Sequence, residues 1–182
     1  MKYFTNLIVL LIAIAASLFI GSSYYYYSPL FKSVTEATAV VYPTKGNKVS
    51  GVVNFAQQKD GIRITAQLSG LTPGNHGFHI HEFGDCACDD AVCAGDHFNP
   101  TNQPHGGPNS EQRHIGDFGN IYADENGNAH YDRVDAGATL NGPHSIVGRA
   151  VIVHVQEDDL KSQPTGNAGA RIGCGVVGVK KN

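Results

Sequence analysis

The sequence lacks tryptophan, has its one methionine at position 1, and carries little charge. Charged residues make up 16% of the 182 residues, and the formal net charge is -3. Nucleic-acid binding needs a basic face, so this balance argues against a nucleic-acid partner. Beyond the N-terminus the sequence also lacks helical periodicity, whereas its 22 glycines and 8 prolines are typical of a turn-rich chain. We therefore expect an all-β protein.

Long apolar runs are absent except at the N-terminus. No charged side chain lies between Lys2 and Lys32, and the apolar run 7–20 is broken only by Ser17. A helix of that length spans about 21 Å, which is shorter than a bilayer core of about 30 Å. An apolar run behind a positive charge at the start of a chain is typical of an export signal.

This run divides the chain into three predicted parts. Cleavage as a signal peptide and retention as an anchor through residues 4–23 are both open, and either fate exports the rest of the chain. We expect a periplasmic or extracellular protein that touches a membrane only through an uncleaved N-terminal segment. The predicted parts are a signal peptide or membrane anchor at 1–23, a tether at 24–36 and one domain at 37–182.

Short apolar runs separated by turn residues fill the predicted domain. Residues 62–68 alternate apolar and polar side chains, as a half-buried strand does. The segment 124–128 is typical of a hairpin turn, and 146–155 is the most apolar strand candidate. About eight strands predict an all-β, eight-stranded Greek-key flattened barrel, an immunoglobulin-like sandwich. The stretch 84–117 has no strand pattern, so it needs a metal and a disulfide to order it.

Nine histidines are the outlier of the composition, and six of them lie between His76 and His114. His79 and His81 are two residues apart, so on a strand both side chains would leave one face and grip one ion. His154 lies in an apolar strand and, taken alone, is more typical of a hydrogen-bonded core histidine. Three imidazoles and a carboxylate suit a closed tetrahedral zinc site, and the loop supplies His97, His105, His114 and Asp117.

Together these segments resemble the copper/zinc superoxide dismutase family. The matching pieces, in order, are GFHIHEFGD, HFNP, PHGGP, RHIGD, GNAGAR and CGVVGV, from about Ala37 to Val179. The resemblance implies an oxidoreductase that dismutates superoxide to dioxygen and hydrogen peroxide, as antioxidant defence outside the cytoplasm. It implies copper as the redox-cycling cofactor, structural zinc, superoxide as the substrate and, in some members, a homodimer.

The resemblance also assigns the ligands. His97 would bridge the two metals and take part in catalysis. Copper would lie on His79, His81, His97 and His154. Zinc would lie on His97, His105, His114 and Asp117.

Other residues take roles from the same resemblance. Asp158 would link a copper histidine to a zinc histidine and so fix both rings. Arg171 would be the active-site arginine that attracts the small anion, and Thr165 would form the other side of the mouth. The remaining histidines match no ligand position and are left as structural: His76, His130 and His144.

Two features resemble the bacterial periplasmic branch of the family. Only LKSQP lies between Asp159 and Thr165, where cytosolic eukaryotic members carry a longer acidic loop, and Cys86 lies eleven residues before His97. HEFGD is closer to the eukaryotic version. With the shortened loop, substrate steering would rest on Arg171, the metals and Lys161.

Four cysteines behind an export signal suggest disulfides, although a thiolate zinc site is the alternative. By resemblance to the bacterial branch, Cys174 pairs with Cys86, and Cys88 is the alternative partner. Cys88 and Cys93 would then form a second, local bridge. On the chain-entropy model, a bridge from Cys86 to Cys174 that closes about ninety residues stabilises by about 4 to 5 kcal/mol.

Three rival interpretations remain. A metal-storing protein on the same fold would lack a copper ligand or the arginine, and neither is missing. A zinc hydrolase needs an open zinc position, whereas four protein ligands fill this one. An adhesive β-sandwich leaves the ligand set unexplained.

Overall fold

A computed structural model describes residues 33–181 of the chain. The predicted signal peptide or anchor and most of the predicted tether lie outside this range. Within it, a compact unit begins at Val34, and the first strand begins at Glu36. No helix within 33–181 has the length and apolar character needed to span a membrane.

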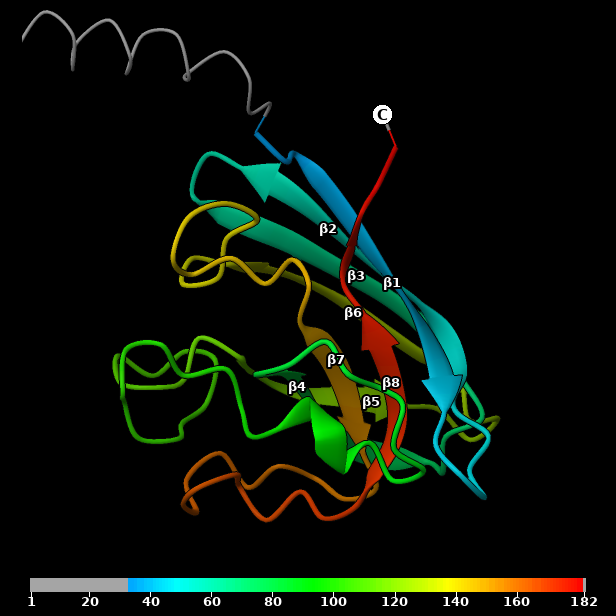
Figure 1. Cartoon of the computed structure of the whole chain (residues 1–182). Coiled ribbons are helices and arrows are strands. Elements are labelled where there is room, and N and C mark those ends of the chain that lie inside the picture. The colour runs from blue at the N-terminus through cyan, green and yellow to red at the C-terminus, as the bar shows by residue number, and fades with distance from the viewer. Residues whose placement is uncertain (1–32, 182) are drawn as a thin grey trace, which may run out of the picture. The chain divides into compact units, whose positions relative to one another are not determined.

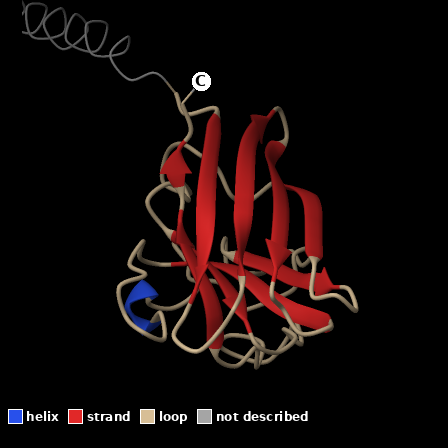
Figure 2. Ribbon diagram, turned by 90° about the vertical axis from the view of Figure 1, so that its right-hand side faces the viewer, coloured by secondary structure: helices blue, strands red, loops and turns tan. Residues whose placement is uncertain are grey.

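Antiparallel strands dominate the fold (Figures 1 and 2). The described residues form nine strands and no α-helix. One short 3-10 helix, η2, spans Val92–Ala94. The strands are β1 Glu36–Pro43, β2 Ser50–Gln58, β3 Gly61–Ser69, β4 Gly74–His81, β5 Asp117–Ala123, β6 Ala129–Asp135, β7 Ala150–His154, β8 Arg171–Val176 and β9 Gly178–Val179.

The sheet closes on itself as a barrel of eight strands. Its order is β2-β3-β6-β5-β4-β7-β8-β1-β9, and β1 pairs again with β2. Because β7 lies beside β4 while β4, β5 and β6 follow one another, the order is that of a Greek key. A single registered pair joins β5 to β6, and two join β1 to β8, so the barrel is flattened into two layers. The predicted fold is confirmed.

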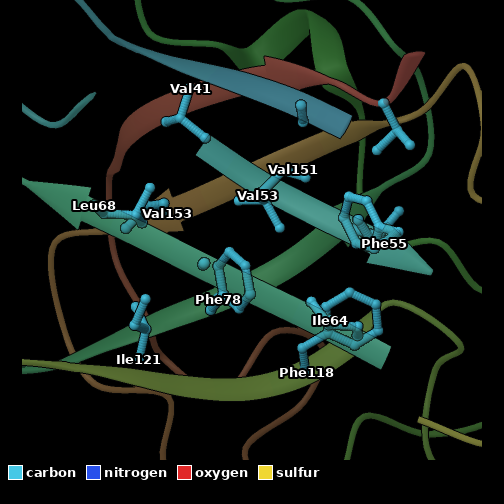
Figure 3. Close-up of a cluster of buried hydrophobic side chains, with 14 of the residues drawn as sticks. Val41, Val53, Phe55, Ile64, Leu68, Phe78, Phe118, Ile121, Val151 and Val153 are labelled. Carbon is cyan, nitrogen blue, oxygen red and sulfur yellow. The ribbon is translucent and has the colours of Figure 1, made fainter. Parts of the chain in front are cut away.

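The two layers enclose an apolar core. On β3 the buried and less buried residues alternate, as predicted for 62–68, whereas β7 is buried throughout because strands flank it and loops cover it. Phe55, Phe78 and Phe118 are among the largest fully buried side chains (Figure 3). The ring of Phe78 lies 5.1 Å from that of Tyr131 and 6.1 Å from that of Phe118, between centroids.

One detail differs from the prediction. The apolar run 146–155 does not form one strand, because Gly148 turns the chain at φ 81 and β7 begins only at Ala150. At the C-terminus, β8 ends at Val176, and the two-residue strand β9 follows it. The predicted hairpin is present, since Gly127 N donates to Asp124 O between β5 and β6.

Two long loops, 82–116 and 155–170, complete the domain and meet each other (Figure 1, green and orange). His105 N donates to Gln163 Oε1 at 2.8 Å, and Gln163 Nε2 donates back to His105 O at 2.9 Å. The first loop is tied to β8 by a disulfide from Cys86 to Cys174, with 5.8 Å between the Cα atoms. A second disulfide joins Cys88 to Cys93 within the loop. Both predicted pairings are confirmed.

Candidate metal centre

The four histidines expected to hold copper converge on one point. His79 and His81 leave β4, and β7, which pairs with β4, supplies His154. His97 joins them because its backbone forms an isolated bridge with His81. One ring nitrogen from each of the four lies within 4.8 Å of the others, and all four side chains are buried.

The four residues expected to hold zinc form a second group, which shares His97 with the first. Asp117 is the first residue of β5 and pairs with His79 of β4, so the strands bring the two groups together. Asp117 Oδ1 lies 2.7 Å from His97 Nδ1 and 3.1 Å from His114 Nδ1. Its Oδ2 lies 3.1 Å from His105 Nδ1.

The outward nitrogen of each ring in the first group, apart from His97, is held by a protein acceptor. His79 Nε2 lies 2.8 Å from Asp158 Oδ2, His81 Nδ1 2.8 Å from Gly95 O, and His154 Nδ1 2.9 Å from Gly169 O. These oxygens accept, so the ring proton sits on the outward nitrogen and the lone pair points inward. Such an arrangement prepares each ring as a metal ligand.

The ring nitrogens that point into each group show whether metal ions fit there. His79 Nδ1, His97 Nε2 and His105 Nδ1 are fully buried and form no hydrogen bond in the described structure, since the His105 contact with Asp117 lacks hydrogen-bond geometry. Burying a polar atom without a partner is unfavourable unless a ligand satisfies it. All three belong to the two groups, so the residues fit two metal ions.

Asp158 links the groups, as the sequence predicted. Its Oδ2 lies 2.8 Å from His79 Nε2 and its Oδ1 lies 2.9 Å from His105 Nε2. Asn120 holds the Asp158 backbone with two hydrogen bonds: Asn120 Nδ2 donates to Asp158 O at 2.8 Å, and Asp158 N donates to Asn120 Oδ1 at 2.7 Å. Gly166, at φ +65, leaves room for the carboxylate, because a Cβ there would overlap Asp158 Oδ1.

The histidine pKa values of the metal-free protein differ between the two groups. Burial, together with nearby His97, holds the pKa of His79 and of His81 well below the ordinary value. Burial also lowers the pKa of His154 to about 4, despite its bond to the Gly169 carbonyl. At His105, burial is outweighed by Asp117 and Asp158, which raise the pKa to about 9. The first group is therefore neutral at pH 7, and the second holds a proton that a metal must displace.

Arg171 lies beside the first group. It begins β8 opposite His154 of β7. Its Nη1 donates to Ala91 O and its Nη2 to Gly95 O, both at 2.6 Å. Gly95 O is also the partner of His81, so the guanidinium and a ligand ring share one oxygen. Burial lowers the pKa of Arg171, but a guanidinium stays charged at neutral pH.

A cleft beside the centre contains two residues that the sequence did not single out, Phe98 and Arg149. His97, His114 and Thr165 line it together with Phe98 and Arg149. The Arg149 guanidinium stacks 3.5 Å from the Phe98 ring centroid. No motif marks Arg149, whose contact depends on two distant segments meeting.

The other histidines have structural surroundings. His76 is buried, with Nδ1 2.8 Å from His154 O and Nε2 2.8 Å from Thr72 O, so it supports the backbone of a ligand. His130 is exposed and His144 is half-buried. Neither belongs to a metal group within the described residues.

Comparison with known proteins agrees with this geometry. The model of the family "Copper/zinc superoxide dismutase (SODC)" matches residues 49–177. The chain belongs to the copper/zinc superoxide dismutase family. "Extracellular superoxide dismutase [Cu-Zn]" of Brugia pahangi is 45% identical over 152 residues, which cover 79% of this chain and 75% of that protein. "Superoxide dismutase [Cu-Zn]" of Onchocerca volvulus is 46% identical over 156 residues, 80% of this chain and 96% of that protein.

A solved structure is similar as well. The clock protein EA4 has a TM-score of 0.76 and 41% sequence identity, and the match covers 82% of this chain and 98% of that chain. The predicted enzyme class, superoxide dismutase, and the predicted cofactors, copper and zinc, are confirmed through the family. The expected kinship with the bacterial branch gains no support, because neither Brugia pahangi nor Onchocerca volvulus is bacterial.

Proposed function

We propose that this chain dismutates superoxide to dioxygen and hydrogen peroxide at copper held by the first histidine group. The observation that carries the proposal is one imidazole, His97, shared by two buried ligand groups. Four imidazoles suit copper, and three imidazoles with a carboxylate suit zinc. Copper binds His79, His81, His97 and His154. Zinc binds His97, His105, His114 and Asp117.

The residues around the centre have separate tasks. When bound, copper supplies the one-electron redox chemistry and zinc a fixed positive charge. His97 Nδ1 faces Asp117, and Nε2, on the side of the copper group, would hold a proton when it is not bound to copper and release it to the product. Arg171 is held beside His81 and His154, where its charge attracts and orients the anionic substrate. Exposed Lys161 adds positive charge to the loop that carries Thr165.

Export is part of the proposal. Two disulfides indicate an oxidising compartment, and the relative from Brugia pahangi is named extracellular. The protein acts in the periplasm or extracellular space, where it removes superoxide. Residues 1–23 are a cleaved signal or, through 4–23, a membrane anchor, 24–36 are a tether, and 37–182 are the dismutase domain.

The domain pairs as a homodimer in this proposal. Val40, Tyr42 and Val176 are exposed apolar side chains that line one groove beside the Cys86–Cys174 bridge. Apolar patches of this kind mark protein interfaces. A charge at the centre of the patch, Tyr42→Lys, should convert a dimer to a monomer in light scattering without changing metal content.

One experiment tests the central proposal. The exported protein is purified, its intact mass is measured with metals retained, and its superoxide-scavenging rate is determined. We expect one copper, one zinc, and a rate within reach of the diffusional ceiling of about 10⁸–10⁹ M⁻¹s⁻¹. Bound copper and zinc without turnover would contradict the proposal and favour a metal-storing role.

A further inference from the structure

Arg171 is held by backbone groups of a single loop segment, 91–95. The guanidinium donates to Ala91 O and to Gly95 O, both at 2.6 Å. His81 Nδ1 lies 2.8 Å from the same Gly95 oxygen. A change in the backbone of 91–95 would therefore move the Arg171 guanidinium, which attracts the substrate in the proposed function.

Ala91 has a conformation that alanine rarely adopts. Its φ of 57 and ψ of 20 lie in the left-handed region, where a Cβ crowds the following carbonyl. Its side chain is fully buried, and its carbonyl accepts from Ala94 N at 3.1 Å as well as from Arg171. This turn aims the Ala91 carbonyl at the guanidinium, so relaxation of φ would turn the oxygen away.

The Cys88–Cys93 disulfide closes a ring around Ala91. The two Cα atoms are 5.7 Å apart, and Ala91 N donates to Cys88 O at 2.9 Å inside the ring. The other disulfide fixes the chain at Cys86, before this turn begins. Asp89 and Asp90 in the ring are exposed, and they hold the turn through hydrogen bonds, from Lys45 N to Asp89 O at 2.8 Å and from Val92 N to Asp90 Oδ1 at 3.1 Å. The local disulfide is thus the covalent constraint on the turn itself.

We propose that the Cys88–Cys93 disulfide is a positioning element for Arg171. By keeping Ala91 in its left-handed conformation, it directs the carbonyl oxygens of Ala91 and Gly95 at the guanidinium. This inference rests on the proposed function, in which Arg171 attracts superoxide. Neither sulfur belongs to a metal group within the described residues, so the bridge acts on the reaction through Arg171.

The test removes the bridge in two backgrounds of the full-length, metal-loaded enzyme. Cys88→Ser with Cys93→Ser should lower the second-order rate about threefold to tenfold and flatten its dependence on ionic strength. Copper and zinc content should not change. The same pair of substitutions with Arg171→Ala should lower the rate no further than Arg171→Ala alone, because coupled residues are non-additive. Val92→Ser, at an exposed residue inside the ring, is the matched control and should leave the rate unchanged.

The outcomes are distinguishable. An unchanged rate, an equal fall in both backgrounds, or a fall that follows metal loss would overturn the positioning role. If Arg171→Ala itself has no effect, the assignment of Arg171 in the proposed function fails instead. Should the serine variant not fold, the bridge is reduced in the folded holoenzyme with dithiothreitol, and peptide mapping verifies that Cys86–Cys174 is intact. Faster amide exchange at Ala94 with a slower rate supports the inference, and either effect without the other contradicts it.

Discussion

The barrel and the two long loops obtain their order from different sources. Each strand from β1 to β8 pairs with neighbours on both sides, and the core between the layers is formed by large apolar side chains such as Phe55 and Phe78. The loops 82–116 and 155–170 contain one three-residue helix and are ordered by two disulfides, by hydrogen bonds between them and by the buried ligand groups. The barrel can therefore be stable without metals, whereas metal ions at the ligand groups would add to the order of the loops.

Phe55→Ala should destabilise the barrel without changing metal binding or activity at the ligand groups. Phe55 is buried on β2, away from the ligand groups, and loss of a buried phenylalanine lowers the free energy of unfolding by about 3–5 kcal/mol. Urea denaturation measures this loss, and the protein that stays folded should keep its metals and specific activity. Val52→Ala, on the outer face of the same strand, is the control and should change stability by no more than about 0.5 kcal/mol. Metal loss from folded Phe55→Ala would show that the two regions are not separable.

His154→Ala should have the opposite effect: it should remove copper and activity while the barrel stays folded. His154 belongs to the first group alone, so copper binding and at least about 100-fold of the activity should disappear while zinc stays bound. Metal analysis and a superoxide assay measure both. His144→Ala is the control, because His144 belongs to neither group within the described chain. Full activity in His154→Ala would mean that the copper site has been assigned wrongly.

Asp158→Asn should weaken both metal sites together. An amide cannot accept from both His79 and His105 as the carboxylate does, and loss of such an outer partner lowers metal affinity by about 10- to 100-fold. Competition with a chelator gives the affinity for each metal. Glu157→Gln alters an exposed neighbour and should change neither affinity. If only one metal is weakened, Asp158 does not couple the sites.

A change of pH, without any substitution, should also alter zinc binding. Because the pKa of His105 is raised to about 9 in the metal-free protein, zinc must displace its proton at neutral pH. Zinc affinity should rise by about tenfold per pH unit up to pH 9 and then level off. Calorimetry in two buffers of different ionisation enthalpy should detect about one proton released at pH 7. An affinity that is flat between pH 7 and pH 9 would contradict the raised pKa.

Much of the barrel was predictable because its signals are local. The alternation at 62–68 follows from one face of β3 packing on the core, and the turn residues at 124–128 mark the hairpin between β5 and β6. The start of β7 was not predictable from apolarity alone. Ile146 is buried but belongs to a turn, so burial did not distinguish the turn from the strand.

The ligand groups were expected mainly through resemblance to a family, since residues from His79 to His154 meet only in three dimensions. A local pattern was available for His79 and His81, two apart on β4. The contacts that hold these residues were beyond the sequence, because they use backbone oxygens such as that of Gly95, and every residue has one. The left-handed turn at Ala91 was missed for the same reason, since alanine gives no signal of it.

The thin seam between β5 and β6, where Ala123 and Ala129 form the one registered pair, has a consequence for self-association. Unpaired strand edges act as templates for strands of other chains and can start fibres. A second thin seam, with two registered pairs, joins β1 to β8, and the other strand edges within residues 36–176 are paired more fully. At the β5–β6 seam, Tyr131 Oη donates to Phe118 O at 2.8 Å and covers the gap with a side chain. Arg113 spans the same seam, since it donates to Asp117 O of β5 and to Asp135 Oδ2 of β6. For an exported protein, beyond the reach of ATP-driven chaperones, these side chains keep the two strand edges from pairing with another chain.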